Sequence, residues 1–177
     1  MQNFKELYAS DLMRYGRKPG AYLRTFHYLL RKAQTESGIK KQFFHKLLLA
    51  HGLIRGLEIS DESSTGKGLY LGHAYTITVN KKAVIGENVN LHKGVLIGRE
   101  NRGKRKGVPT IGNNVWIGIN AAIVGKVIIG NDVLIAPNAY VNFDVPDHSI
   151  VIGNPGRIYP CENATKDYIH FESSPAE

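Results

Sequence analysis

An aliphatic residue recurs at every sixth position through most of residues 57–141, and no other feature of the sequence restricts the fold as strongly. Neither an α-helix, with a period of 3.6 residues, nor an ordinary strand, with a period of two, places such a repeat on one face. Hexapeptide repeats are typical of parallel β-helices. We therefore predict a mainly β protein built on a left-handed parallel β-helix, in which each hexad forms one side of a triangular coil. The inward positions are Ile59, Thr65, Leu71, Val79, Ile85, Leu91, Ile97, Ile111, Ile117, Ile123, Ile129, Ile135 and Val141.

The repeat also predicts which residues share an edge of the coil. Three hexads make one turn, so every third hexad should lie on the same side. Between Leu71 and Val79 the chain has two residues more than one hexad, which should widen the corner that contains His73. We expect one side to stack Ile59, Val79, Ile97, Ile123 and Val141, and the edge leading into it to align His73, His92, Ile119-Asn120 and Pro137-Asn138.

Residues 1–55 have the apolar spacing of helices rather than of hexads. One stripe contains Phe26, Leu29, Leu30 and Ala33, and a second contains Phe43, Phe44, Leu47, Leu48 and His51. We interpret both stripes as core. The sequence therefore predicts a helical region at 1–55, a β-helix domain at 56–158 that is interrupted by a loop at 99–108, and a C-terminal tail at 159–177.

The chain of 177 residues carries a formal charge of +8, which favours anionic partners. The segment Arg99–Lys106 holds five basic residues and one acidic residue, but no aromatic residue, so we expect a solvated loop and no nucleic acid as a partner. No run of about 18 apolar residues is present, so we expect no membrane span. The single cysteine, Cys161, and an N-terminus without an apolar segment favour a cytoplasmic protein.

His73 and Glu58 are candidate catalytic residues. Glu58 lies on the side that the His73 corner leads over, so the carboxylate and the imidazole could meet. A carboxylate behind a histidine fixes its tautomer and steadies the imidazolium, the arrangement of a general base. His92, on the next turn of the same edge, is the alternative base. An ordinary solvated surface histidine is the competing interpretation of His73.

Other chemistries have less support in the sequence. The seven histidines show no short two-histidine spacing within the repeat, so we expect no metal. A zinc β-helix of the γ-carbonic-anhydrase kind would need such a pair and a third histidine from a facing subunit. The basic loop leaves open a non-catalytic β-helix protein that binds an anionic ligand.

Several motifs together resemble serine acetyltransferase and its exopolysaccharide relatives, over about residues 20–158. Glu58 and His73 are fifteen positions apart and fall on the carboxylate–histidine dyad of that family, in which the acid is usually aspartate. The motifs that carry the resemblance are Gly56-Leu57-Glu58-Ile59, Leu71-Gly72-His73-Ala74, Asn90-Leu91-His92-Lys93-Gly94-Val95, Pro109-Thr110-Ile111-Gly112, Asp144-Val145-Pro146 and Gly153-Asn154-Pro155-Gly156-Arg157.

This resemblance implies direct transfer of acetyl from acetyl-CoA to a hydroxyl, with His73 as general base and Glu58 orienting its ring. Family members lay the pantetheine along one edge of the coil, against main-chain groups of successive corners. The resemblance also implies a homotrimer with active sites between subunits. The residues implied to contact CoA are Gly118, Ile119, Ala136 and Pro137 for the pantetheine, and Lys126 or Arg157 for the phosphates.

Two departures from the serine enzymes bear on the acceptor. Those enzymes usually carry aspartate just before the dyad histidine, where this chain has Gly72, and Arg-His before the Pro-x-Ile-Gly step, where it has Gly107-Val108. The groups that would hold the ammonium and carboxylate of serine are therefore mostly absent. Short exopolysaccharide O-acetyltransferases of the colanic-acid type share a Gly-His corner followed by a segment like Val79-Asn80-Lys81-Lys82. We expect a saccharide hydroxyl as acceptor, as in polysaccharide biosynthesis, with serine O-acetyltransferase of cysteine biosynthesis as the alternative.

Overall fold

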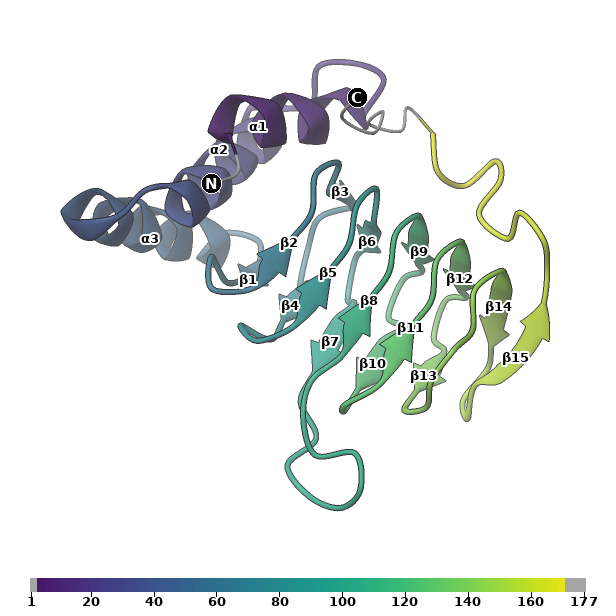
Figure 1. Cartoon of the computed structure of the whole chain (residues 1–177). Helices are drawn as coiled ribbons and strands as arrows, with labels where there is room; N and C mark the ends of the chain where they lie inside the picture. The colour runs from purple at the N-terminus through teal and green to yellow at the C-terminus, as the bar shows by residue number, and fades with distance from the viewer. Residues whose placement is uncertain (1–2, 171–177) are drawn as a thin grey trace.

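The computed structural model describes residues 3–170, which form three helices followed by a parallel β-helix (Figure 1). The helices are α1 (Phe4–Met13), α2 (Ala21–Thr35) and α3 (Gly38–Leu53). They lie together at the end of the β-helix where the strands begin. The N-terminal region is thus helical, as the spacing of its apolar residues predicts.

The strands form three sheets, one on each side of the coil. The first sheet contains β1 (Glu58–Ile59), β4 (Thr78–Val79), β7 (Leu96–Gly98), β10 (Ala122–Val124) and β13 (Tyr140–Val141). The second contains β2 (Ser64–Thr65), β5 (Val84–Ile85), β8 (Thr110–Ile111) and β11 (Ile128–Ile129). The third contains β3 (Tyr70–Gly72), β6 (Asn90–His92), β9 (Val115–Ile117), β12 (Val133–Ile135), β14 (Ser149–Ile152) and β15 (Arg157–Pro160).

The inward positions of the hexads form the core, as predicted. None of them is more than 4% exposed, although one is the polar Thr65. Neighbouring turns place Ile59 opposite Val79 and Ile97 opposite Ile123, so the predicted stacking is confirmed. Fully burying one Val, Leu or Ile side chain contributes about 1.5–3 kcal/mol. The stacked aliphatic column therefore holds the turns together and in register.

The edge between the third and first sheets is built from left-handed backbone. Gly56, Thr76, Gly94, Asn120 and Asn138 have φ values between 51° and 75°. These five residues lie one below the other in consecutive turns. Each one after Gly56 donates its backbone N–H to the carbonyl of the residue that precedes the corner residue of the turn before, as Asn120 does to Lys93, which precedes Gly94. Glycine and asparagine adopt positive φ at low cost, so these residue types let the chain turn the corner.

A buried ion pair closes the open end of the β-helix. The first turn has no turn above it, so its backbone groups there lack strand partners. Arg31 donates through Nη1 to the Thr65 carbonyl at 2.8 Å and through Nη2 to the Gly66 carbonyl at 2.7 Å. Asp11 receives the Leu69 N–H at 2.9 Å and pairs with the Arg31 guanidinium. Burial raises the pKa of Asp11, but Arg31 and His27 outweigh it and the net pKa is lowered.

The end of α1 extends this cap toward the third sheet. Arg14 donates through Nη1 to the Gly68 carbonyl at 2.8 Å, and the Tyr15 hydroxyl accepts the Leu71 N–H at 3.2 Å. The first turn is thereby fixed by side chains of α1 and α2 rather than by a further strand. This turn carries Glu58 and leads into the corner that contains His73.

The second apolar stripe is only partly core, which corrects the expectation for α3. Leu48 is buried, but Phe43 is 56% exposed and Leu47 is 39% exposed. Helix α3 packs on α2 and the first strand with one face only, and its opposite face has no cover within the described chain. Leu53 and Ile54 continue this exposed apolar surface.

The segment 161–170 returns along the outer face of the third sheet (Figure 1), and we refer to it as the C-terminal strap. The Asp132 carboxylate accepts the N–H groups of Ala164 at 3.0 Å and Thr165 at 2.9 Å. Near the end of the strap, Asn90 Nδ2 donates to the Tyr168 carbonyl at 3.3 Å. The strap thus connects the turn that contains β12 to the turn that contains β6.

None of the helices within residues 3–170 has the length and apolar character needed to cross a membrane.

Replacing Arg31 with Met should destabilise the protein by about 3–5 kcal/mol, because it leaves Asp11 buried without its charge partner. The free energy of unfolding from denaturant titration measures this loss. Lys32→Met is the matched control, since Lys32 is the next residue and its ion pair with Glu36 is only partly buried. Equal stability of the two variants would contradict a structural role for the buried pair.

Candidate active site

The corner after β3 is widened by two residues, as predicted. Lys93 N–H donates to the Gly72 carbonyl and Gly94 N–H donates to the Tyr75 carbonyl, both at 3.0 Å. In this turn the chain rounds the corner between Gly72 and Thr76. In the next turn the matching corner runs only from His92 to Gly94. His73 begins the widened segment with an exposed side chain and a φ of 49°.

His92 lies one position away from its predicted alignment. Strand pairing sets Gly72 opposite His92, so Lys93 rather than His92 follows His73 along the edge. The His92 ring lies against Gly72, where a Cβ would collide with it. The predicted alignment is one residue off because it took the second residue after Leu71 but the first residue after Leu91, although Leu71 and Leu91 are directly paired. His92 nevertheless remains close enough for the charge on His73 to influence its pKa.

The tautomer of His92 is fixed by the backbone. Its Nδ1 lies 2.9 Å from the Ile117 carbonyl oxygen, which can only accept, so Nδ1 carries the proton and Nε2 is free to accept. Burial lowers the pKa of His92 below its ordinary 6.5; the Ile117 contact opposes this and His73 reinforces it. Its contribution to stability is present above pH 6.5 and is lost as the pH falls through the lowered pKa. His92 is therefore neutral at pH 7.

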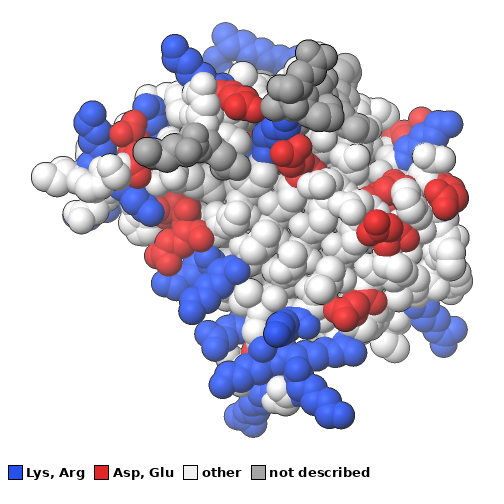
Figure 2. Space-filling model, in the orientation of Figure 1, with Lys and Arg blue, Asp and Glu red and all other residues white. Residues whose placement is uncertain are grey.

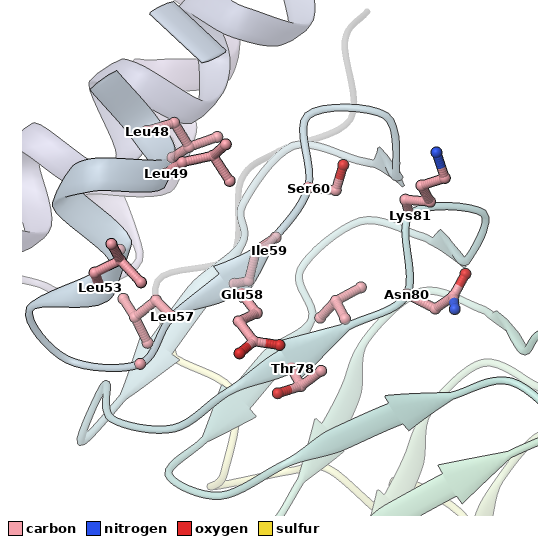
Figure 3. A pocket seen from close by; sticks show the side chains of 13 residues that line it. Leu48, Leu49, Leu53, Leu57, Glu58, Ile59, Ser60, Thr78, Asn80 and Lys81 are labelled. Carbon is pink, nitrogen blue, oxygen red and sulfur yellow. The ribbon is translucent and has the colours of Figure 1, made fainter. Parts of the chain in front are cut away.

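Glu58 lines a groove between α3 and the first sheet (Figure 3). The groove has a volume of about 630 Å³, and Leu48, Leu49 and Leu53 of α3 lie across it from the sheet. Figure 3 shows the Glu58 side chain beside that of Thr78 on the neighbouring strand. The groove is mainly apolar, with the Glu58 carboxylate near its centre.

Glu58 and His73 are brought to the same flank of the molecule. The backbone N–H of Glu58 donates at 2.8 Å to the carbonyl of Ile77, the residue that follows the His73 corner. Within residues 3–170 no hydrogen bond or ion pair joins the two side chains, so the dyad stays a prediction.

The residues predicted for pantetheine lie along the edge that also carries His73. Asn138 N–H donates to the Ile119 carbonyl at 2.9 Å, which sets Pro137 next to Ile119 in the row below Lys93. Gly118 and Ala136 form the parallel row below His92. A Cβ on Gly118 would lie 2.7 Å from the Pro137 nitrogen, so glycine allows the two turns to approach. Their role in binding CoA stays a prediction.

The two predicted phosphate contacts lie at different edges. Arg157 is exposed on β15 opposite Ile152, beside the end of the row that contains Ala136. Lys126 is exposed at the edge between the first and second sheets, under the basic loop, where its N–H donates to the Arg105 carbonyl at 2.9 Å. A single chain therefore does not bring Lys126 together with the His73 edge.

The basic loop projects from the β-helix as a short hairpin. Glu100 and Gly107 exchange two backbone hydrogen bonds of 3.0 Å, and the Glu100 carboxylate accepts the N–H groups of Asn101 and Arg102. Residues 101–106 are all exposed. Figure 2 shows Lys and Arg side chains gathered at this end of the molecule. Gly107 has a φ of 147°, and a Cβ there would lie 2.9 Å from Lys126 Cβ.

An aromatic recess beside His92 was missed in the sequence. It is formed on the outer face of the third sheet, where Tyr70 and Trp116 each lie between two inward hexad positions. Strand alternation turns such residues outward, which is the signal that could have identified them. The other walls come from α1 and the C-terminal strap, which sequence spacing does not place near this sheet.

No group of three or more His, Cys, Asp or Glu side chains converges as a metal site within residues 3–170.

Comparison with known families and proteins agrees with this geometry. Residues 109–142 match the family described as bacterial transferase hexapeptide (six repeats). A serine acetyltransferase of Helicobacter pylori is 35% identical over 101 residues, which cover 57% of this chain and 59% of the relative. The chain thus spans about six-tenths of the length of that relative. One of Synechococcus elongatus is 33% identical over 113 residues, covering 63% of this chain and 46% of the relative.

Solved structures of similar fold include the soybean serine acetyltransferase apoenzyme, with a TM-score of 0.72 and 27% identity. The match covers 88% of this chain and 69% of the soybean chain. The serine complex of the Neisseria gonorrhoeae enzyme gives a TM-score of 0.70 and 26% identity, with the same coverage. Sequence and fold together confirm that this chain resembles the serine acetyltransferase-like proteins of the hexapeptide-repeat transferases.

Proposed function

We propose that this protein is an acetyl-CoA-dependent O-acetyltransferase. The observation that carries the proposal is the single edge on which His73 and the corner residues Gly118, Ile119, Ala136 and Pro137 lie, with the turn of His92 and Lys93 between them. The likeness to serine acetyltransferases supports the same chemistry. Acetyl-CoA would lie along this edge with its thioester at the His73 corner, and Arg157 or Lys126 would contact its phosphates. The Lys126 contact fits a neighbouring subunit better than the same chain.

In the proposed reaction His73 takes the proton of the acceptor hydroxyl while the oxygen attacks the thioester carbonyl. The new C–O bond forms, the C–S bond breaks, and the proton passes from the imidazolium to the CoA thiolate. Glu58 orients the ring and stabilises its charged form. His92 is the second candidate for the base, because its Nε2 is a free acceptor in a neutral ring at pH 7.

His73→Ala should lower kcat by about 10²–10⁴, the usual loss when a general base is removed, while acetyl-CoA still binds. Glu58→Gln should cause a smaller loss, because only orientation and charge stabilisation are removed. Steady-state kinetics and equilibrium CoA binding separate the two effects. If His73→Ala retained turnover within about threefold of wild type and His92→Ala did not, the base would be His92.

The acceptor is a separate proposal, and the relatives support L-serine. The curated relatives are named serine acetyltransferases, and solved structures of similar fold include complexes with serine. These relatives share about a third or less of their residues with this chain over the matched part. Serine O-acetylation in cysteine biosynthesis is therefore the alternative function.

The site chemistry supports a saccharide hydroxyl instead. A Cβ on Gly72 would collide with the His92 ring, and one on Gly107 would crowd Lys126. The two positions where the serine enzymes place groups near the amino acid thus admit no side chain in this packing. A small zwitterion needs fixed opposite charges, whereas a sugar ring is bound by hydrogen bonds and apolar contact. We therefore favour a saccharide acceptor and a role in polysaccharide biosynthesis, in the cytoplasm, where acetyl-CoA is made.

The enzyme should acetylate at least one simple saccharide with a higher kcat/KM than L-serine, because both serine-holding positions are closed. Release of free CoA thiol, measured with each acceptor in turn, gives the comparison. A serine value above about 10⁴ M⁻¹s⁻¹, the lower end for ordinary enzymes, with no saccharide near it, would establish the serine function instead.

We also propose a homotrimer with active sites between subunits. One chain presents the His73 edge without a facing wall, and α3 leaves the apolar side chains of Leu53 and Ile54, 81% and 70% exposed, next to the Glu58 groove. Exposed apolar surface of this kind marks contact regions. Light scattering should give a mass three times that of one chain. A stable monomer with full turnover would contradict the shared site.

A further inference from the structure

The aromatic recess beside His92 has the composition of a sugar-binding site. In the third sheet, Tyr70, Asn90 and Trp116 are paired across consecutive turns and point outward together. The His92 ring lies next to this row, with its centroid 4.6 Å from that of Trp116. Two aromatic side chains therefore flank Asn90, whose buried amide is already bonded to Arg14 and to the Tyr168 carbonyl.

Side chains from both ends of the chain wall this surface. Tyr15 at the end of α1 lies 4.6 Å from Tyr70 between ring centroids, and Tyr168 of the C-terminal strap lies 5.1 Å from Trp116. The recess has a volume of about 200 Å³, below the roughly 300–1,000 Å³ of sites for drug-sized ligands. Its size therefore suits one small ring rather than an extended chain.

Several polar groups at the recess are available to a ligand. Tyr70, Trp116 and Tyr168 have hydroxyl or indole N–H groups without hydrogen-bond partners in the described chain, and His92 offers Nε2. The guanidinium of Arg14 is already engaged by the carbonyls of Gly68 and His170 and by Asn90. No acidic side chain lines the recess. An ammonium group would therefore find no carboxylate partner in the recess.

We propose that this recess binds one neutral pyranose ring of the acceptor. The proposal rests on the O-acetyltransferase function and names where its acceptor is held. A pyranose has an apolar C–H face and a rim of hydroxyls. The C–H face can pack on the aromatic side chains that line the recess, and the hydroxyls match the free polar groups. Because the His92 ring lies on Gly72, a ring seated here borders the corner from which His73 projects.

The test uses Trp116, which is the only tryptophan of the chain, so its fluorescence reports on the recess alone. Wild-type protein is titrated with methyl α- and β-glycosides of glucose, galactose and mannose, with L-serine and with acetyl-CoA. We expect a saturable change of the Trp116 emission with at least one glycoside and none with L-serine. The glycoside that binds should also be the one that is acetylated.

Matched tyrosine variants separate recognition from folding. Tyr168→Ala should raise the Kd and KM for that glycoside by about three- to tenfold, the loss expected for one aromatic contact, with the KM for acetyl-CoA unchanged. Tyr159→Ala is the control, because Tyr159 lies on the same sheet outside the recess and is 49% exposed, against 51% for Tyr168. It should change neither constant.

The outcomes distinguish the site from the function. Acetylation of a glycoside without a Trp116 response, and with equal KM values in the two variants, would overturn the recess while the enzyme function stands. A saturable Trp116 response that Tyr168→Ala weakens, without acetyl transfer, would support the recess and overturn the function. Transfer to L-serine alone, with no glycoside response, would overturn both.

Discussion

The open end of the first turn sets the constraint on which the rest of the structure depends. A parallel β-helix satisfies the backbone groups of each turn with the next one, so its first turn needs another source of partners. Here Arg31 and Arg14 donate to carbonyls of that turn, and Asp11 holds Arg31 while accepting a backbone N–H. Because both members of the ion pair are fully buried, the three helices and the β-helix form one unit. The first turn carries Glu58 and leads to His73, so the cap also positions the candidate dyad.

The corner that contains His73 shows how one insertion creates a site within a regular repeat. The neighbouring turns cross this edge with a single left-handed residue, as at Asn120 and Asn138. The corner after β3 is two residues longer, so Thr76 takes the left-handed corner position of this turn and His73 lies ahead of it. Gly72 leaves room for the His92 ring, which is held by the Ile117 carbonyl. The His92 ring thus fills the space beside Gly72 that a side chain at this position would need.

The face beside this corner is shaped by segments that are distant in sequence. The third sheet supplies Tyr70 and Trp116, the segment just after α1 supplies Tyr15, and the strap supplies Tyr168. The strap is held there by Asp132, whose pKa is raised by burial but lowered overall by the hydrogen bonds from Thr165, His148 and Ala164. The groove with Glu58 lies on the first sheet and the recess with His92 lies on the third sheet, and these two sheets meet at the His73 edge. Side chains of α3 line the groove, and residues that follow α1 line the recess.

The sequence by itself determined the β-helix, its core and its register, because the period of six restricts the inward positions so tightly that Ile59, Val79, Ile97 and Ile123 can only stack. It also placed His73 on the same edge as Gly118, Ile119, Ala136 and Pro137. Only the tertiary structure decided that the His92 ring packs against Gly72 and that its Nδ1 donates to the Ile117 carbonyl, because a repeat fixes which residues are neighbours but not how their side chains lie. It also decided that Phe43 and Leu47 are exposed, since helical spacing gives one apolar face without saying whether a partner covers it. The cap and the aromatic recess needed the fold as well, because Arg31 and Tyr168 reach partners that are far away in the chain and leave no local pattern.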